Sequence, residues 1–159
     1  MTLIYISISG NTRSFVQRLQ TYASTQQAQN PALPLVELKE IHDNSSLQAE
    51  TTPFFAFVPT YLEGGNGVET GEQEILTESL YDYLAFKENA RYCLGVIGSG
   101  NKNFNRQYCL TAKQYAAKLG FPFLDDYELR GTQADLQRIY QLLVQKNGEI
   151  TENNFPQKE

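Results

Sequence analysis

A short run of hydroxyl, glycine and amide residues lies where an apolar strand pattern changes into a helix pattern. The run consists of Ser7, Ser9, Gly10, Asn11 and Thr12. A strand that leads into a helix start directs several backbone N–H groups at one point, and the positive end of the helix dipole favours an anion there. The first cation, Arg13, lies one step inside the expected helix. We therefore expect a cradle of neutral donors for a phosphate group, although a well-capped helix without a ligand would use the same residue types.

Two common kinds of phosphate loop do not fit this run. The chain lacks the Gly-Lys-Ser/Thr ending of an NTPase P-loop. Gly10 also stands without the G-x-G-x-x-G pattern of a dinucleotide fold. A mononucleotide phosphate therefore fits the run better than a pyrophosphate.

The spacing of apolar residues predicts strands and helices that alternate along the chain. Short apolar runs indicate strands at about 3–8, 35–38, 53–59, 92–97 and within 123–129. Helical spacing indicates helices at about 12–25, 72–86, 106–119 and 132–144. This alternation is typical of an α/β domain. We expect a three-layer, doubly wound parallel sheet of five strands in the order 2-1-3-4-5, with the second strand at an edge and the third in the centre.

Three polar, glycine-containing loops follow the first, third and fourth predicted strands. They cover residues 7–12, 60–71 and 98–108. In a sheet of this strand order the carboxyl ends of those strands meet at the switch point, where ligands bind. The sequence therefore predicts a single ligand site at this edge of the sheet.

Composition limits the classes of partner. The chain has 159 residues and a net charge of −5, and its basic residues form no stripe, which argues against nucleic acid and anionic membranes. We expect a cytoplasmic protein with a single domain over residues 1–147 and a polar tail over 148–159. Cys93 and Cys109 are expected to be packed thiols, and His42, the one histidine, a solvated loop residue, which leaves no basis for a transition-metal site.

Other classes of protein with this fold are excluded by particular residues. A phosphorelay receiver needs an aspartate at the end of the third strand, where this chain has Pro59 and Thr60. It also needs a lysine at the end of the fifth strand, and no lysine lies near Leu129. A thiol phosphatase needs a cysteine in the phosphate loop, which has none. What remains is a mononucleotide with a planar ring, for which FMN is the natural candidate.

The same loops carry a family resemblance. Residues 7–12 resemble the flavodoxin phosphate loop, and residues 60–67 together with 98–109 resemble the NrdI family, the flavodoxin-like proteins that accompany class Ib ribonucleotide reductases. The most specific part is the segment Gly98-Ser99-Gly100-Asn101-Lys102-Asn103-Phe104-Asn105-x-x-Tyr108-Cys109. The resemblance covers nearly the whole chain and implies a flavodoxin-like fold.

The resemblance also implies a function. Members of this family bind FMN and reduce dioxygen to a superoxide-type oxidant, which serves to assemble the dimanganese and tyrosyl-radical cofactor of the small reductase subunit, NrdF. The implied partners are NrdF, dioxygen and an unidentified reductant of the flavin. The implied phosphate ligands are Ser7, Ser9, Gly10, Asn11 and Thr12. One side of the flavin ring would be lined by Thr60, Tyr61, Gly64 and Gly65, and the other by Ser99, Gly100, Asn103, Phe104 and Asn105.

The residues themselves agree with this in two respects. Glycines between Gly64 and Gly67 would let a peptide flip beside the ring at little steric cost. Residues 101–105 are neutral to basic, and fewer negative charges near a reduced flavin would bring its two one-electron steps closer together. Glu63 could oppose a negatively charged reduced flavin, so the orientation of its carboxylate bears on the same point. With no acid–base pair or nucleophile evident, we expect an activator in which the flavin supplies the chemistry rather than a stand-alone enzyme.

Two alternatives remain at this point. A general flavodoxin that carries electrons between a reductase and several acceptors would use the same fold and the same phosphate loop. A flavin-free interaction domain would keep the fold without the ligand, although the run at 9–12 argues against it.

Overall fold

The computed structural model describes residues 1–60, 77–103 and 108–152, with side chains to residue 150. Its centre is one parallel sheet in the order β2-β1-β3-β4-β5, which confirms the predicted strand order. The strands are β1 (Thr2–Tyr5), β2 (Glu37–Glu40), β3 (Phe54–Pro59), β4 (Cys93–Gly100) and β5 (Phe123–Glu128).

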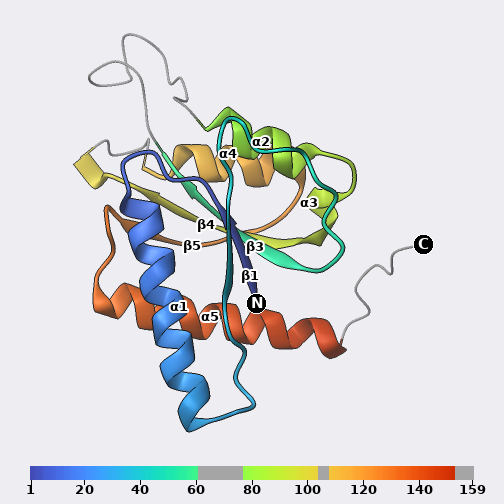
Figure 1. The fold of residues 1–159 in the computed structure, drawn as a ribbon. Coiled ribbons are helices and arrows are strands. Elements are labelled where there is room, and N and C mark those ends of the chain that lie inside the picture. The colour runs from blue at the N-terminus through green and yellow to red at the C-terminus, as the bar shows by residue number, and fades with distance from the viewer. Residues whose placement is uncertain (61–76, 104–107, 153–159) are drawn as a thin grey trace.

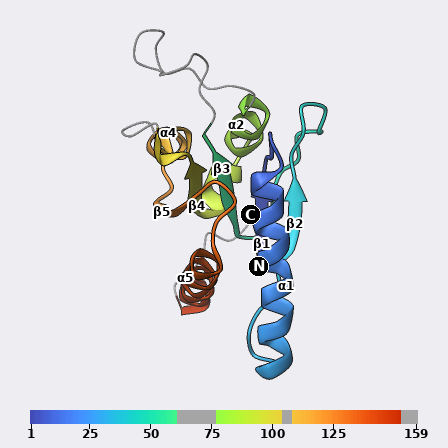
Figure 2. The same cartoon turned by 90° about the vertical axis from the view of Figure 1, so that its left-hand side faces the viewer.

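Helices cover both faces of the sheet, which confirms the three layers. One face carries α1 (Asn11–Gln29) and α5 (Gln133–Glu152), and the other carries α2 (Glu78–Ala85), α3 (Asn89–Tyr92) and α4 (Leu110–Leu119). Figure 2 shows the sheet between these two layers. None of the helices within the described ranges is long and apolar enough to cross a membrane.

The strand residues alternate between two cores. Leu3, Phe55 and Ile97 pack beneath α1 and α5. Ile4, Ala56 and Val96 pack against the other helix layer. A central strand that is covered on both faces must be apolar at every position, which is why β3 reads as a continuous apolar run. Residues of β2 are more exposed, as expected of an edge strand.

Several predicted boundaries were wrong. Strand β4 continues through Gly98 to Gly100, a stretch that the sequence suggested was a loop, because residues 97–100 pair regularly with β5. Helix α5 continues to Glu152, so the expected tail at Gly148 falls inside a helix, and exposed polar residues there are compatible with its solvent side. Helix α4 begins at Leu110 rather than near 106, and the short helix α3 was not predicted. The first part of the helix predicted at 72–86, up to residue 76, lies outside the described residues.

Candidate functional site

The edge predicted to bind a ligand is formed by the carboxyl ends of β1, β3 and β4 and by the start of α1. These three strands are neighbours in the sheet. The end of β4 is joined to its two neighbours, because the backbone N–H of Thr60 after β3 donates to the Ser99 carbonyl at 2.9 Å and that of Leu129 after β5 donates to the Gly100 carbonyl at 2.9 Å. The carboxyl ends of β3, β4 and β5 therefore form one connected rim of the sheet, beside the start of α1.

Gly10 sets the shape of the cradle at the start of α1. It is the residue that precedes the helix, in a left-handed conformation with φ of 93°, and no described side chain caps the helix there. A Cβ at Gly10 would have no neighbour within 4 Å among the described atoms, so the space beside it is open. The helix begins with a hydrogen bond from Ser14 N–H to the Gly10 carbonyl at 3.0 Å. The N–H groups of the first turn have no partner within the helix, as at any helix start.

Two other residues of the run adopt distinct roles. The Ser7 hydroxyl oxygen accepts the backbone N–H of Arg13 at 3.2 Å. Thr12 is buried with 1% of its surface exposed, and its hydroxyl has no hydrogen-bond partner within the described part of the chain. A left-handed glycine beside open space and an unpartnered buried hydroxyl are features that a phosphate group would fit.

Arg13 is not a free phosphate ligand. Its guanidinium donates two hydrogen bonds to the Glu40 carboxylate, at 2.8 and 2.6 Å, and the Tyr5 hydroxyl donates to the same carboxylate at 2.8 Å. The hydrogen bonds from Arg13 hold the pKa of Glu40 below its ordinary value. Glu40 of β2 thus neutralises the charge of Arg13, the cation nearest the run. This supports the expectation that neutral groups bind the phosphate.

Thr60 and Gly100 shape the opposite part of the rim. The Thr60 hydroxyl accepts the backbone N–H of Thr111 at 3.1 Å and so joins the end of β3 to the first turn of α4. A Cβ at Gly100 would lie 3.2 Å from the backbone nitrogen of Cys109. Glycine there permits the close approach of the chain that leads into α4.

The remaining predicted ring contacts divide into two groups. Ser99 lies inside β4 with 4% of its surface exposed, on the face toward α1, while Asn103 is exposed and donates its backbone N–H to Asn101 Oδ1 at 2.9 Å. Their contact with a flavin stays a prediction. The other predicted ring contacts lie outside the described residues: Tyr61, Gly64, Gly65, Phe104 and Asn105.

The loop after β4 has acidic neighbours that the sequence did not reveal. Glu128 of β5 accepts the backbone N–H of Lys102 at 3.0 Å. The Tyr108 hydroxyl donates to Asp126 at 3.0 Å, and Lys102 Nζ lies 5.6 Å from the centre of the Tyr108 ring. The pKa of the Tyr108 hydroxyl is raised, mainly because the residue is partly buried. The loop itself is neutral to basic, but β5 places two carboxylates beside it.

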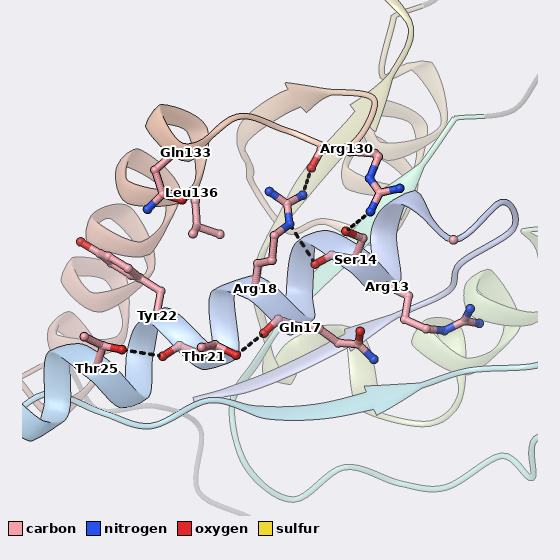
Figure 3. A pocket seen from close by; sticks show the side chains of 11 residues that line it. Arg13, Ser14, Gln17, Arg18, Thr21, Tyr22, Thr25, Arg130, Gln133 and Leu136 are labelled. Atoms are coloured by element: carbon pink, nitrogen blue, oxygen red, sulfur yellow. Dashed lines mark hydrogen bonds between the residues drawn. The ribbon is translucent and has the colours of Figure 1, made fainter.

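A groove of about 680 Å³ runs from the cradle along α1. In Figure 3 the Arg18 side chain reaches the backbone of Arg130, and the Arg130 side chain reaches Ser14. Arg18 donates to the carbonyls of Ser14 and Gly131, both at 3.3 Å, and to that of Arg130, while Arg130 donates to the Ser14 hydroxyl at 3.0 Å. Carbonyl and hydroxyl oxygens rather than carboxylates accept these bonds, so the groove keeps a positive character next to the cradle.

The two cysteines are free and buried, as predicted. Burial raises the pKa of each thiol to about 12. The His42 side chain is exposed, as predicted, and its Nε2 lies 3.5 Å from the Glu40 carboxylate. Among the described residues, no group of three or more His, Cys, Asp or Glu side chains could hold a metal ion.

A doubly wound parallel sheet in this strand order, with an open helix start at the switch point, defines a protein of the flavodoxin-like class. Solved structures agree with this fold. The structure is similar to a short-chain flavodoxin associated with a non-canonical PDU bacterial microcompartment, with a TM-score of 0.60 and 17% identity over 95% of this chain and 96% of that one. It is also similar to oxidised flavodoxin 2 from Bacillus cereus, with a TM-score of 0.60 and 18% identity over 93% and 98% of the two chains.

Sequence comparison gives the family within that class. The family described as NrdI Flavodoxin like matches residues 3–141. A NrdI-like protein of Streptococcus pyogenes serotype M18 is 53% identical over 144 residues, which cover 91% of this chain and 92% of that protein. Protein NrdI of Mycoplasma capricolum is 33% identical over 139 residues, which cover 87% and 77% of the two chains. The chain belongs to the NrdI flavodoxin-like family, as its resemblance implied.

Proposed function

We propose that this protein binds FMN and reduces dioxygen to a superoxide-type oxidant for assembly of the dimanganese and tyrosyl-radical cofactor of NrdF. The observation that supports this most is the open cradle at Gly10 and Thr12, at the switch point of a chain that belongs to the NrdI family. A phosphate is the part of FMN that a neutral helix start binds.

The residues of the chain act by holding and orienting. Backbone N–H groups of the first turn of α1 and the Thr12 hydroxyl would bind the phosphate of FMN, while Ser7 fixes the first turn by accepting the Arg13 N–H. Thr60 and Gly100 hold the start of α4 against the rim. When bound, the flavin supplies the electron-transfer chemistry.

The proposed partners are NrdF, dioxygen and a reductant that delivers electrons to the flavin. The proposed compartment is the cytoplasm, since two free and buried cysteines fit a reducing environment. The groove with Arg18 and Arg130 offers a positive surface beside the cradle on an otherwise acidic protein.

A spectroscopic experiment tests the ligand first. FMN is added to the purified protein, and its visible spectrum and fluorescence give the dissociation constant. Thr12→Val should weaken FMN binding at least about tenfold, because a hydrogen bond to a charged group is lost. Thr21→Val is the matched control, since the Thr21 hydroxyl lies on the same helix, exposed, and donates to the Gln17 carbonyl at 3.2 Å. Equal effects of the two substitutions would contradict the proposed cradle.

A second experiment tests the reaction. The FMN-loaded protein is reduced anaerobically, mixed with NrdF that contains Mn²⁺, and exposed to oxygen, and electron paramagnetic resonance then measures the tyrosyl radical. The proposal predicts radical only when the reduced flavoprotein and dioxygen are both present. Radical formation with dioxygen alone, or none under any condition, would refute it.

A general electron-carrying flavodoxin is the second candidate. Asp126 and Glu128 lie beside the loop after β4, and this favours the alternative because carboxylates near the ring disfavour addition of the second electron. Anaerobic titration separates the two candidates. Overlapping one-electron steps fit the activator, and well-separated steps fit the carrier.

A further inference from the structure

Three hydroxyl groups lie together in the core directly beneath the cradle. They belong to Thr12 of α1, Ser99 of β4 and Tyr127 of β5, which have 1%, 4% and 2% of their surfaces exposed. No role for the Tyr127 hydroxyl follows from the sequence patterns above, and a tyrosine in an apolar core ordinarily needs a partner for its hydroxyl.

The fold fixes how these residues meet. Ser99 and Tyr127 are direct cross-strand partners, so their side chains lie on the same face of the sheet, toward α1. The Tyr127 ring stacks on Phe15 with centroids 3.9 Å apart and an angle of 11° between the rings. Thr12 lies three residues before Phe15 on α1, on the same side of the helix. Ser99 and Thr12 both interact with the Tyr127 hydroxyl.

The ring of Tyr127 is held in place on two sides. Phe15 covers one face, and the turn after β5 closes in at Gly131, where a Cβ would lie 2.6 Å from Phe15 and 3.1 Å from Tyr127. Gly131 has a φ of 74°, and its N–H donates to the Glu128 carbonyl at 2.9 Å. A ring clamped in this way delivers its hydroxyl to one fixed point.

The hydrogen bonding of this cluster is incomplete in the described part of the chain. Neither the Thr12 hydroxyl nor the Tyr127 hydroxyl has a hydrogen-bond partner of good geometry there. An unsatisfied buried hydroxyl costs free energy. Two such hydroxyls lie together beneath the cradle, and an anion bound there would give them a reason to be unpaired without it. Burial raises the pKa of Tyr127, so its hydroxyl stays protonated and is able to donate.

We propose that Tyr127 is a positioning residue for the phosphate site: its hydroxyl donates to Thr12 Oγ1, and Thr12 in turn donates to a phosphate oxygen in the cradle. The inference rests on the proposed phosphate-bearing ligand. A threonine hydroxyl has one proton to donate. When Thr12 Oγ1 accepts a hydrogen bond from Tyr127, the Thr12 proton remains available to donate to the anion. Tyr127 thereby favours a flavin that carries a phosphate over one that does not.

Tyr127→Phe tests this role, and Tyr140→Phe is its matched control. Tyr140 of α5 is also buried in this core, and its hydroxyl has no partner among the described residues, but Tyr140 packs against Tyr22 instead of Thr12. Binding of FMN and of riboflavin, which lacks the phosphate, is measured by quenching of flavin fluorescence. Tyr127→Phe should weaken FMN binding about fivefold to tenfold, the loss of one hydrogen bond, and leave riboflavin binding unchanged. Tyr140→Phe should leave both unchanged.

A double-mutant cycle with Thr12→Val tests whether Tyr127 acts through Thr12. The double variant should bind FMN no more weakly than Thr12→Val alone, because the second hydroxyl has lost the group it positions. Melting temperature supplies a readout that separates positioning from structural support. Without ligand, Tyr127→Phe should melt no lower than the unchanged protein, because the Tyr127 hydroxyl has no hydrogen-bond partner of good geometry among the described residues before a phosphate binds.

Four results would overturn the inference: unchanged FMN affinity in Tyr127→Phe, equal weakening of FMN and riboflavin, additive effects in the cycle, or a lower melting temperature without ligand. If the unchanged protein binds neither flavin, the proposed function fails, and inorganic phosphate still tests the hydroxyls. Phosphate should then raise the melting temperature of the unchanged protein more than that of Tyr127→Phe at equal ionic strength, and an equal rise would refute the role of Tyr127.

Discussion

Two alanine substitutions at glycines should change stability in opposite directions. Gly98 lies inside β4, where a Cβ would be 2.9 Å from the Ala112 Cβ, 3.0 Å from Phe123 Cε2 and 3.1 Å from the Cys109 Cβ. The Ala112 and Cys109 Cβ atoms are attached directly to the backbone, so they cannot rotate away from an added Cβ. Overpacking of this kind costs about 1–3 kcal/mol, so Gly98→Ala should destabilise the protein by that amount.

Gly148 is the matched counterpart. It is exposed and lies inside α5, where an added Cβ would have no described atom within 4 Å. Alanine is favoured over glycine in a helix by about 0.5–1 kcal/mol, so Gly148→Ala should stabilise the protein by that amount. If residue 98 were in an open loop and residue 148 in a tail, as the sequence suggested, both substitutions would be close to neutral.

Urea unfolding followed by circular dichroism measures both variants against the unchanged protein. The two midpoints should lie on opposite sides of the unchanged midpoint, with similar dependence on urea. In thermal unfolding each kcal/mol corresponds to about 2–4 °C for a chain of this size. A Gly98→Ala variant within about 0.5 kcal/mol of the unchanged protein would refute the argument that a Cβ at residue 98 overpacks against Ala112 and Cys109.

Three further outcomes follow from single contacts. Thr60→Val should lower stability by about 1 kcal/mol in the same urea assay, because a backbone N–H of α4 loses its acceptor, and an unchanged midpoint would contradict this. Hydrogen bonds from Arg13 lower the pKa of Glu40, so this pair stabilises the protein fully above the ordinary glutamate pKa and less as the pH falls through the lowered value. Glu40→Gln should therefore flatten the decline of melting temperature between about pH 5 and pH 3, and an equally steep decline would argue against the pair. Burial raises the thiol pKa of Cys93 and Cys109 to about 12, so a thiol reagent at about pH 8 should label neither in the native protein and both after unfolding, whereas rapid native labelling would show an exposed thiol.

The strand order and the layers were predictable from the sequence because they depend on the apolar pattern. A continuous apolar run such as 54–58 is typical of a strand covered on both faces, and loops rich in glycine after the first, third and fourth strands locate the switch point. The edge position of β2 followed from its alternating pattern, and the free cysteines were predicted from their spacing and an expected reducing compartment.

Boundaries were less predictable, for physical reasons that concern particular residues. Gly98, Ser99 and Gly100 have loop composition, but pairing with β5 holds them in a strand. Gly148 is an ordinary helix terminator by type, yet α5 passes through it. In both cases tertiary contacts or helix continuity outweigh a local preference, which is worth about 1 kcal/mol for glycine.

The cluster of three hydroxyl groups could not be predicted from local sequence patterns. Thr12, Ser99 and Tyr127 come from three elements, and they meet only because the register of β4 with β5 pairs Ser99 with Tyr127 and because Phe15 stacks on the tyrosine ring. A signal did exist in the sequence, namely a tyrosine at a core-facing position of the last strand. Its meaning depends on the register, which strand patterns alone do not fix to a single residue.

The register of β4 with β5 also changes the charge expected around the loop after β4, on which the argument about the flavin potentials depends. Residues 101–103 contain one lysine and no acid, so the loop read by itself favours easy addition of a second electron. Strand β5 returns to this edge and places Glu128 at the backbone of Lys102 and Asp126 at Tyr108. Because Lys102 and these two carboxylates lie at one rim, the local charge there is set by the fold rather than by the loop. Under the proposed function, Glu128→Gln and Asp126→Asn should bring the two one-electron potentials of bound FMN closer together, and unchanged potentials would show that these carboxylates do not act on the flavin.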